Sequence, residues 1–265
     1  MDLIIGQATD VGIKRQGNPN QDHIGVVLPE TKQNTTLLIV ADGMGGHRGG
    51  EQASLIVVNK LRDHFLQSQN KKGCEDILRE GIFLAHNQMA EIAAQDDSLI
   101  KMGSTIAAVI IENNKLTLAN VGDTRAYIIN ENNIHQISWD HSFVYDLVRK
   151  NLITAEEAQT HPKRNVLTMS ISAQRQDTEI YITQITLDAR DVVLLCSDGL
   201  WGPVTEAQIQ AVGWELPPQQ AVLKLIELAN RNQGPDNISV IIARHQLAQV
   251  TTKRHNEVLL EDTQP

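Results

Sequence analysis

The chain has 265 residues and a formal net charge of −9, with 41% hydrophobic and 21% charged residues. This composition fits one large or two small globular domains, and the negative charge disfavours a surface built for nucleic acid or anionic lipid. It has no apolar run of the roughly 18–20 residues that a membrane span needs and no basic-then-apolar leader, and its two cysteines exclude a disulfide framework. We therefore expect a soluble, cytoplasmic protein.

The first predicted elements are strands, followed by a pair of helices. Short β-like runs occupy Leu3–Ala8, Ile24–Leu28 and Leu37–Ala41. Apolar residues then recur at helical spacing from Ala53 to Phe65 and again from Leu78 to Ala93.

The middle of the chain changes to a strand pattern. Four runs are separated by segments rich in turn residues: Ile106–Ile111, Leu116–Val121, Arg125–Ile129 and Ile134–Ile137. Such a pattern predicts an antiparallel meander.

Helices and strands alternate less regularly after this point. Residues 142–160 have a helical pattern, in which Asn151–Thr154 is expected to cap a second short helix. Further strands are predicted at Thr178–Ile185, Val192–Cys196 and Ile238–Ala243, and a last helix at Pro218–Asn230.

The order of these elements predicts the fold class. Strands come in hairpins and the long helices in adjacent pairs, which favours an α+β layered domain whose helices cover antiparallel sheets. We expect one domain over residues 1–246 and a polar, disordered tail over 247–265.

Five aspartates stand at the ends of strand-like runs: Asp22, Asp42, Asp123, Asp198 and Asp236. Any one of them could simply form a turn, because Asp-Gly and Asp-Asn are common turn pairs. Converging carboxylates repel one another and need a cation, and oxygen ligands without a Cys or His cluster favour Mg²⁺ or Mn²⁺ over zinc. The pattern indicates an oxygen-ligated divalent metal site.

The glycine-rich segment Asp42–Glu51 does not fit a nucleotide-binding loop. A dinucleotide fingerprint needs Gly where Arg48 stands, and a Walker loop needs Lys where Glu51 stands. Lone histidines are most often surface or core residues, but His47 lies close enough to Asp42 to be a candidate proton donor. The sequence also lacks a Gly-x-Ser-x-Gly elbow and a Cys-x₅-Arg motif, so phosphate chemistry here would use a metal-activated water.

The segments around the five aspartates resemble the bacterial branch of the metal-dependent type 2C protein phosphatases, the PPM family. The similarity is carried by Val40–His47, Asn120–Tyr127, Cys196–Leu200 and Gly234–Ile238. Met102–Thr105, Asp140–Ser142 and His161–Leu167 are also similar, and the matches follow the family order from Thr9 to Ala243.

The resemblance implies a four-layer α-β-β-α sandwich with two central antiparallel sheets and a dinuclear Mn²⁺ or Mg²⁺ centre at one end. The positions that match the family's core metal ligands are Asp22, Asp42, Asp198, Asp236 and the carbonyl of Gly43. Asp123 matches the acid of a third, weaker metal site.

The resemblance also implies roles for residues that bind no metal. His47 matches a general acid or phosphate-orienting histidine, and Arg15 matches the phosphate-binding arginine. Residues 141–165 correspond to a flap beside the active site, in which His161 is expected to sense substrate.

The implied activity is that of a protein serine/threonine phosphatase in bacterial signalling, which hydrolyses phosphoserine and phosphothreonine monoesters by a metal-activated bridging water. We expect a monomer with a phosphoprotein substrate and no nucleic-acid or membrane partner. Two alternatives stay open: a phosphatase of a small phosphorylated metabolite, and a weakly active, metal-binding phosphoprotein regulator. The regulator hypothesis is motivated by the loop from Arg15 to Asp22, which is longer than in the family pattern. A second departure is Ser172, which stands where the family usually has Gly and bears on the geometry of the flap.

Overall fold

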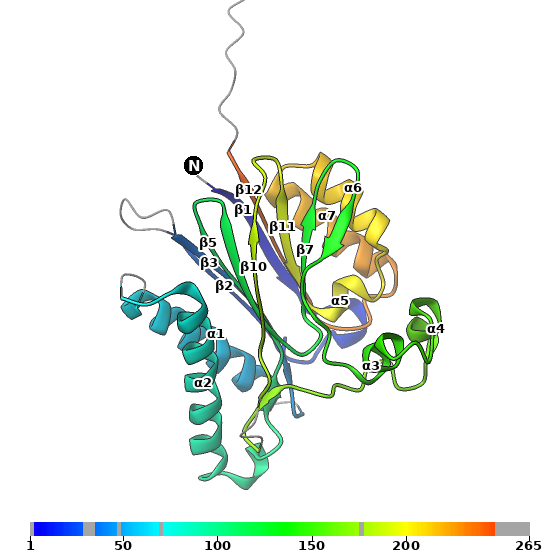
Figure 1. Cartoon of the computed structure of the whole chain (residues 1–265). Coiled ribbons are helices and arrows are strands. Elements are labelled where there is room, and N and C mark those ends of the chain that lie inside the picture. The colour runs from blue at the N-terminus through cyan, green and yellow to red at the C-terminus, as the bar shows by residue number, and fades with distance from the viewer. Residues whose placement is uncertain (1–2, 29–34, 47–48, 69–70, 175–177, 247–265) are drawn as a thin grey trace, which may run out of the picture.

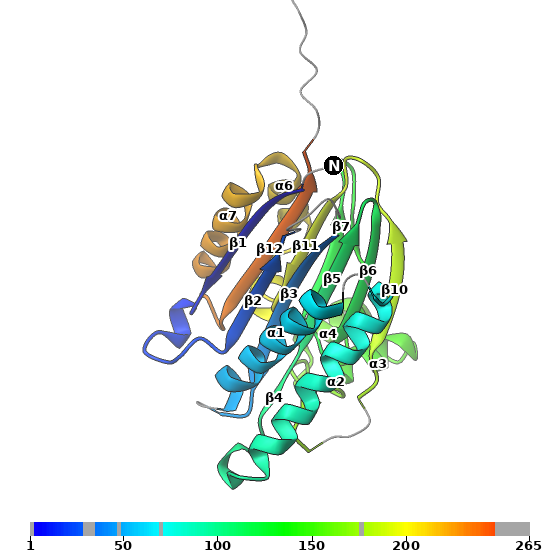
Figure 2. The ribbon, with the colours of Figure 1, turned by 90° about the vertical axis from the view of Figure 1, so that its left-hand side faces the viewer.

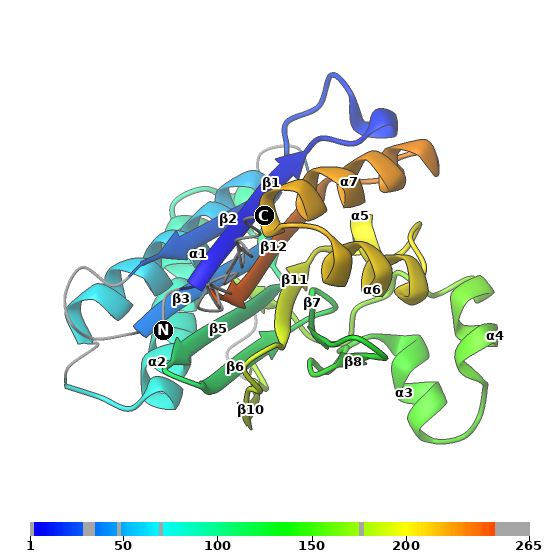
Figure 3. The same ribbon diagram turned by 90° about the horizontal axis from the view of Figure 1, so that it is seen from above.

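The protein forms two antiparallel β-sheets that face each other and are covered on their outer sides by helices (Figure 1). The structure is a computed structural model that describes residues 3–28, 35–46, 49–68, 71–174 and 178–246. Viewed from above, the layers follow one another as helices, sheet, sheet, helices (Figure 3). The predicted four-layer α-β-β-α sandwich is thus confirmed.

The first sheet has five strands in the order β1-β12-β11-β7-β8. Their bounds are β1 Leu3–Asp10, β12 Ile238–His245, β11 Val192–Cys196, β7 Arg125–Ile129 and β8 Ile134–Gln136. Two helices cover its outer face, α6 (Glu206–Glu215) and α7 (Pro218–Arg231) (Figure 1).

The second sheet has seven strands in the order β10-β6-β5-β3-β4-β9, with β2 also paired to β3. Their bounds are β10 Tyr181–Thr186, β6 Lys115–Val121, β5 Ile106–Glu112, β3 Thr35–Met44, β4 Gly103–Ser104, β9 Ile171–Ser172 and β2 Asp22–Val27. Its outer face is covered by α1 (Gly49–Ser68) and α2 (Cys74–Ala93), which lie in front of the sheet in Figure 2.

Three hydrophobic clusters fill the spaces between these layers, and strand β3 contributes to two of them. Leu38 and Val40 point into the cluster between the sheets, whereas Leu37 and Ile39 pack against α1 and α2. All four side chains are fully buried. Because successive side chains of a strand point to opposite faces, a run without polar residues can fill both clusters.

One predicted arrangement is wrong. The strands between residues 106 and 137 do not form one meander, because β5 and β6 pair in the second sheet and β7 and β8 in the first. The chain crosses from one sheet to the other at Gly122–Thr124, where Gly122 has a positive φ of 93°. A local hairpin turn and a sheet crossing use the same residue types, so the turn residues alone could not separate them.

The predicted flap projects from the side of the sandwich and carries two short helices, α3 (Phe143–Arg149) and α4 (Ala155–Thr160) (Figure 1). The expected cap of the second helix is confirmed as a capping box between Thr154 and Glu157. The sequence prediction omitted α6, the single-turn helix α5 (Asp198–Trp201) and the 3₁₀ turns η1 (Ile13–Arg15) and η2 (Asp97–Leu99). The tail at 247–265 lies outside the described residues.

None of the described helices combines the length and the apolar character that a bilayer crossing requires.

Candidate metal centre

The five predicted acids meet at one end of the two sheets. Asp22 begins β2 and lies opposite Asp42 of β3 in the strand register. Asp198 begins α5 directly after β11, and Asp236 lies two residues before β12. Asp123 stands in the crossing between β6 and β7. Both sheets therefore contribute acids to the same place.

A cavity of about 500 Å³ opens at this place. Four of the acids line it, together with Arg15, part of the glycine-rich segment and the last residue of the flap: Asp42, Asp123, Asp198, Asp236, Arg15, Asn18, Pro19, Gln21, Gly43–Gly46, Thr105, Asn165, Leu167 and Asn237. Asp22 lies behind them and is buried. The cavity is large enough for a phosphate group with part of its carrier.

Burial and mutual repulsion both act on these carboxylates. Burial raises the pKa of Asp22 to about 7, with repulsion from Asp198 and Asp236 adding to the shift. Burial followed by repulsion from Asp236 raises the pKa of Asp198 to about 6. The pKa values of Asp42 and Asp123 are also raised, first by burial and then by neighbouring aspartates. A carboxylate that titrates this way is stabilised in its charged form by a nearby cation.

The donor set fits a hard divalent ion. The Oδ1 atoms of Asp22 and Asp198 are buried and have no hydrogen-bond partner within the described part of the chain. Buried carboxylate oxygens normally accept hydrogen bonds or bind a cation, and a set of oxygen donors suits Mn²⁺ or Mg²⁺. Among the described residues, no three His, Cys, Asp or Glu side chains already surround one point as a closed metal-binding group.

The glycine-rich segment follows its path because side chains would not fit there. A Cβ on Gly43 would lie 2.0 Å from the carbonyl oxygen of Gly50, where α1 begins. Gly45 has a φ of 118°, and a Cβ there would lie 2.4 Å from the carbonyl oxygen of Lys101. The glycines thus let the chain turn sharply from β3 into α1 and leave the Gly43 backbone at the cavity.

Ser104 and Thr105, from the segment Met102–Thr105 that resembles the family, hold the backbone of Asp42 in place. Thr105 donates its backbone N–H to the Asp42 carbonyl at 2.8 Å, and its hydroxyl accepts from the Asp42 N–H at 3.1 Å. The hydroxyl of Ser104 also donates to the Asp42 carbonyl, at 3.0 Å. The Ser104–Thr105 pair, which carried no assigned role in the sequence, therefore fixes the backbone of a candidate ligand.

Sequence reasoning also missed Asn237, which joins the two sheets beside the acids. Its side-chain oxygen accepts from the Gln21 N–H at 2.8 Å, and its amide donates to the Val11 carbonyl at 2.8 Å. Asn237 thereby fixes the loop that leads into Asp22. Its signal was the Asp236-Asn237 pair, which resembles an ordinary turn.

Arg15 lies at the cavity, and its role in binding phosphate stays a prediction. Its Nη2 donates to Asp236 Oδ2 at 2.7 Å. The side chains of Arg15 and Asp236 are 45% and 35% exposed, so the guanidinium remains accessible from the cavity.

The two predicted histidines have different outcomes. His47 lies outside the described residues. His161 directly follows α4 as its C-cap, and the centroid of its ring lies 5.9 Å from the centroid of the Phe143 ring. His161 is not among the described residues that line the cavity; of the predicted flap, only Asn165 is among them. Substrate sensing by His161 stays a prediction.

Comparisons with known proteins agree with this geometry. The family model described as Protein phosphatase 2C matches residues 12–248. The chain is 34% identical over 237 residues to a serine/threonine phosphatase, stp, of Listeria welshimeri, covering 87% of this chain and 92% of that protein. It is 34% identical over 244 residues to the protein phosphatase PhpP of Streptococcus pneumoniae, covering 90% and 96%.

Solved structures of serine/threonine phosphatases also have a fold similar to that of this chain. The serine/threonine phosphatase PstP/Ppp of Mycobacterium tuberculosis superposes with a TM-score of 0.84 at 31% identity, covering 93% of this chain and all of that chain. Stp1 of Staphylococcus aureus superposes with a TM-score of 0.85 at 34% identity, covering 93% and 96%. The catalytic domain of PstP in complex with two manganese ions superposes with a TM-score of 0.78 at 30% identity, covering 92% and 99%. With its paired sheets, its converging aspartates and a match over most of its length, the chain belongs to the Protein phosphatase 2C family.

Proposed function

We propose that this serine/threonine phosphatase of the 2C type hydrolyses phosphoserine and phosphothreonine in proteins at the cavity lined by four of its five aspartates. The observation that carries the proposal is the convergence of four strand-end acids on one cavity. Beside it, the buried Oδ1 atoms of Asp22 and Asp198 have no hydrogen-bond partner among the described residues. The relatives' names support the substrate class, because stp and PstP are called serine/threonine phosphatases.

The proposed core ligands are Asp22, Asp42, Asp198, Asp236 and the carbonyl of Gly43, holding two Mn²⁺ or Mg²⁺ ions. Asp123 is the proposed acid of a third, weaker site. Bound divalent ions would supply an activated water and would neutralise charge on the phosphate during its hydrolysis. The two manganese ions in the PstP structure support a dinuclear centre.

The chain's own residues would bind and orient the phosphoryl group. Arg15 can offer its accessible N–H groups to two phosphate oxygens while remaining beside Asp236. Asn165, at the end of the flap, and Leu167, just after it, also line the cavity and would contact the residues around the phosphorylated side chain. His47 stays the proposed proton donor to the leaving serine or threonine oxygen.

We also propose one catalytic domain over residues 1–246, with a flap at about 141–165, acting as a monomer. A reducing compartment such as the cytoplasm is supported by Cys74 and Cys196, which form no disulfide.

The deciding experiment is a panel of phosphopeptides and small phosphorylated metabolites, measured with Mn²⁺, with Mg²⁺ and with chelator. Phosphate release from phosphopeptides should stop when chelator is added and return when metal is restored. Turnover that does not depend on metal would contradict the proposal. Faster turnover of the metabolites would favour a small-molecule phosphatase. Binding of phosphopeptide without turnover would favour a regulator.

A pair of variants tests the site itself. Asp198→Asn should abolish turnover, because it removes a charged ligand while keeping the side-chain shape. Asp188→Asn is the matched control, because Asp188 is exposed in the turn before β11 and away from the cavity.

A further inference from the structure

The indole of Trp201 is contacted on two sides by the Asp123 crossing. Its Nε1–H donates to the Asp123 carbonyl oxygen at 3.0 Å. The Arg125 guanidinium lies over the ring, with Cζ 3.8 Å from the ring centroid. Residues 123 and 125 therefore both contact the side chain of Trp201, the last residue of α5.

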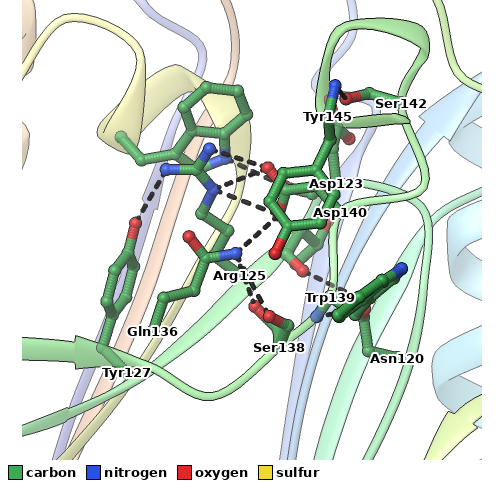
Figure 4. Close-up of polar contacts among 12 residues, drawn as sticks. Asn120, Asp123, Arg125, Tyr127, Gln136, Ser138, Trp139, Asp140, Ser142 and Tyr145 are labelled. Atoms are coloured by element: carbon green, nitrogen blue, oxygen red, sulfur yellow. Dashed lines mark hydrogen bonds and ion pairs between the residues drawn. The ribbon is translucent and has the colours of Figure 1, made fainter. Parts of the chain in front are cut away.

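Arg125 is itself held firmly. Its Nε donates to both carboxylate oxygens of Asp140, at 3.2 Å to Oδ1 and 3.0 Å to Oδ2, and its Nη2 donates to Oδ2 at 2.7 Å (Figure 4). Its Nη1 donates to the Tyr127 hydroxyl at 3.0 Å. The Arg125 and Asp140 side chains are only 18% and 4% exposed. A bidentate pair with this burial fixes the plane of the guanidinium, so the stacking on Trp201 is preorganised.

This arrangement matters because the two acids that it connects repel each other. Helix α5 runs from Asp198 to Trp201, so a single turn separates a proposed metal ligand from the indole. Repulsion from Asp198 is the largest effect of any neighbouring charge on Asp123. The contacts of Trp201 with residues 123 and 125 act against this repulsion.

We propose that Trp201 is a positioning residue that clamps the Asp123 crossing onto α5, and that Arg125 and Asp140 lock the clamp. The clamp sets the separation of the Asp123 and Asp198 carboxylates, and with it the affinity of the weaker metal site at Asp123. The inference rests on the proposed function, because it assumes that Asp123 holds an ion there.

The clamp also reaches the flap. Asp140 directly precedes His141, whose Nδ1 accepts from the Gly122 N–H at 3.1 Å and whose own N–H donates to the Gly122 carbonyl at 2.9 Å. Both bonds go to Gly122, directly before Asp123, whereas Asp140 pairs with Arg125, two residues after it.

A purely structural role for Trp201 is the competing explanation, because its ring also packs on the cluster under α6 and α7. Trp201→Phe separates the two roles. Phenylalanine keeps an aromatic ring for the packing and for the Arg125 stacking, but it cannot donate to the Asp123 carbonyl. Trp214→Phe is the matched control, because Trp214 packs on the same cluster from α6.

The experiment is a calorimetric Mn²⁺ titration of the full chain, with free Mn²⁺ counted by electron paramagnetic resonance. Removing a partner that orients a metal ligand typically lowers affinity about 10–100-fold. We expect Trp201→Phe to lower the Mn²⁺ affinity of the weakest binding event about tenfold or more and to leave the affinities of the two tighter binding events unchanged. Trp214→Phe should match wild type, and Asp123→Asn should lose the weak event and so identify it.

If Trp201→Phe binds Mn²⁺ with wild-type affinity at every site, the clamp is overturned. It is also overturned if the wild-type chain binds only two Mn²⁺ ions. The second result leaves the proposed dinuclear function intact, whereas a chain that binds no Mn²⁺ overturns both. Thermal unfolding in chelator checks that each variant is folded. If Trp201→Phe is not, Arg125→Lys replaces it, because lysine keeps the charge but loses the fork; an unchanged weak event in that variant also overturns the clamp.

Discussion

The hydroxyl of Ser197 donates a buried hydrogen bond of 2.7 Å to Asp22 Oδ2, across 175 positions of sequence. The same hydroxyl oxygen accepts from the Ser239 N–H at 3.0 Å, so the serine is held from the neighbouring strand. Asp22 Oδ1 is left without a hydrogen-bond partner in the described part of the chain. Ser197 therefore fixes one oxygen of the carboxylate and leaves the other available to an ion.

Ser197→Ala should weaken Mn²⁺ binding about tenfold, the lower end of the range for residues that orient metal ligands. The variant loses the donor to Asp22 and also leaves the Ser239 N–H unpaired, which should lower the free energy of unfolding by about 1–3 kcal/mol. Calorimetry and denaturant unfolding measure the two effects. Ser68→Ala, at the buried end of α1, is the control. An unchanged Mn²⁺ affinity in Ser197→Ala would show that Asp22 needs no such support.

Asp42→Asn should have opposite effects with and without metal. The pKa of Asp42 is raised by burial and then by Asp22, Asp198 and further aspartates, so removing its charge relieves repulsion in chelated protein. The melting temperature in chelator should therefore rise, while the stabilisation by added Mn²⁺ should disappear. Scanning calorimetry in both conditions checks this. A lower melting temperature in chelator would mean that the acids do not repel one another as the geometry indicates.

The raised pKa values also predict how the chelated protein responds to pH. Asp22 and Asp198 have pKa values of about 7 and 6 against an ordinary value of 3.8, and both are raised first by burial. The folded state thus binds protons more tightly than the unfolded chain, so their stabilising contribution is complete below about pH 4 and is lost as the pH rises to about 7. In chelator, these acids should make the melting temperature fall over this range. Saturating Mn²⁺ should remove that slope, and an equal slope with metal would contradict the linkage.

The sequence predicted the strands best where burial on both faces leaves no polar residue. The strand Val192–Cys196 is an example, and its predicted bounds agree with the structure. Helix α6 was missed because Ile209 and Gly213 are its only buried residues, which gives little helical periodicity. Its start was nevertheless present as a capping box between Thr205 and Gln208.

The acids of the candidate site could be predicted from the sequence, but the residues that hold them in place could not. The five aspartates could be found because each stands at the end of an apolar run. The contacts of Ser197 with Asp22 and of Trp201 with Asp123 join distant parts of the chain, and nothing in the local pattern marks them. The same limit explains the sheet crossing at Gly122, which has the local signature of a hairpin.

Arg15 should affect substrate binding far more than stability. Its ion pair with Asp236 is exposed, and exposed pairs contribute about 0–1 kcal/mol, so Arg15→Ala should unfold almost like wild type. Loss of charge-assisted hydrogen bonds to phosphate, each worth about 1.5–3 kcal/mol, should raise KM for a phosphopeptide about tenfold or more. Arg15→Lys should lie between the two, because lysine keeps the charge without the fork.

Steady-state kinetics with one phosphopeptide at saturating Mn²⁺ measures this effect. Arg62→Ala is the control, because Arg62 is 44% exposed and pairs with Asp63 on α1, away from the cavity. A fall in kcat with KM unchanged would place the role of Arg15 in the chemical step instead of in binding. Unchanged kinetics would mean that the longer loop before Asp22 has moved this arginine out of use, and that another group captures the phosphate.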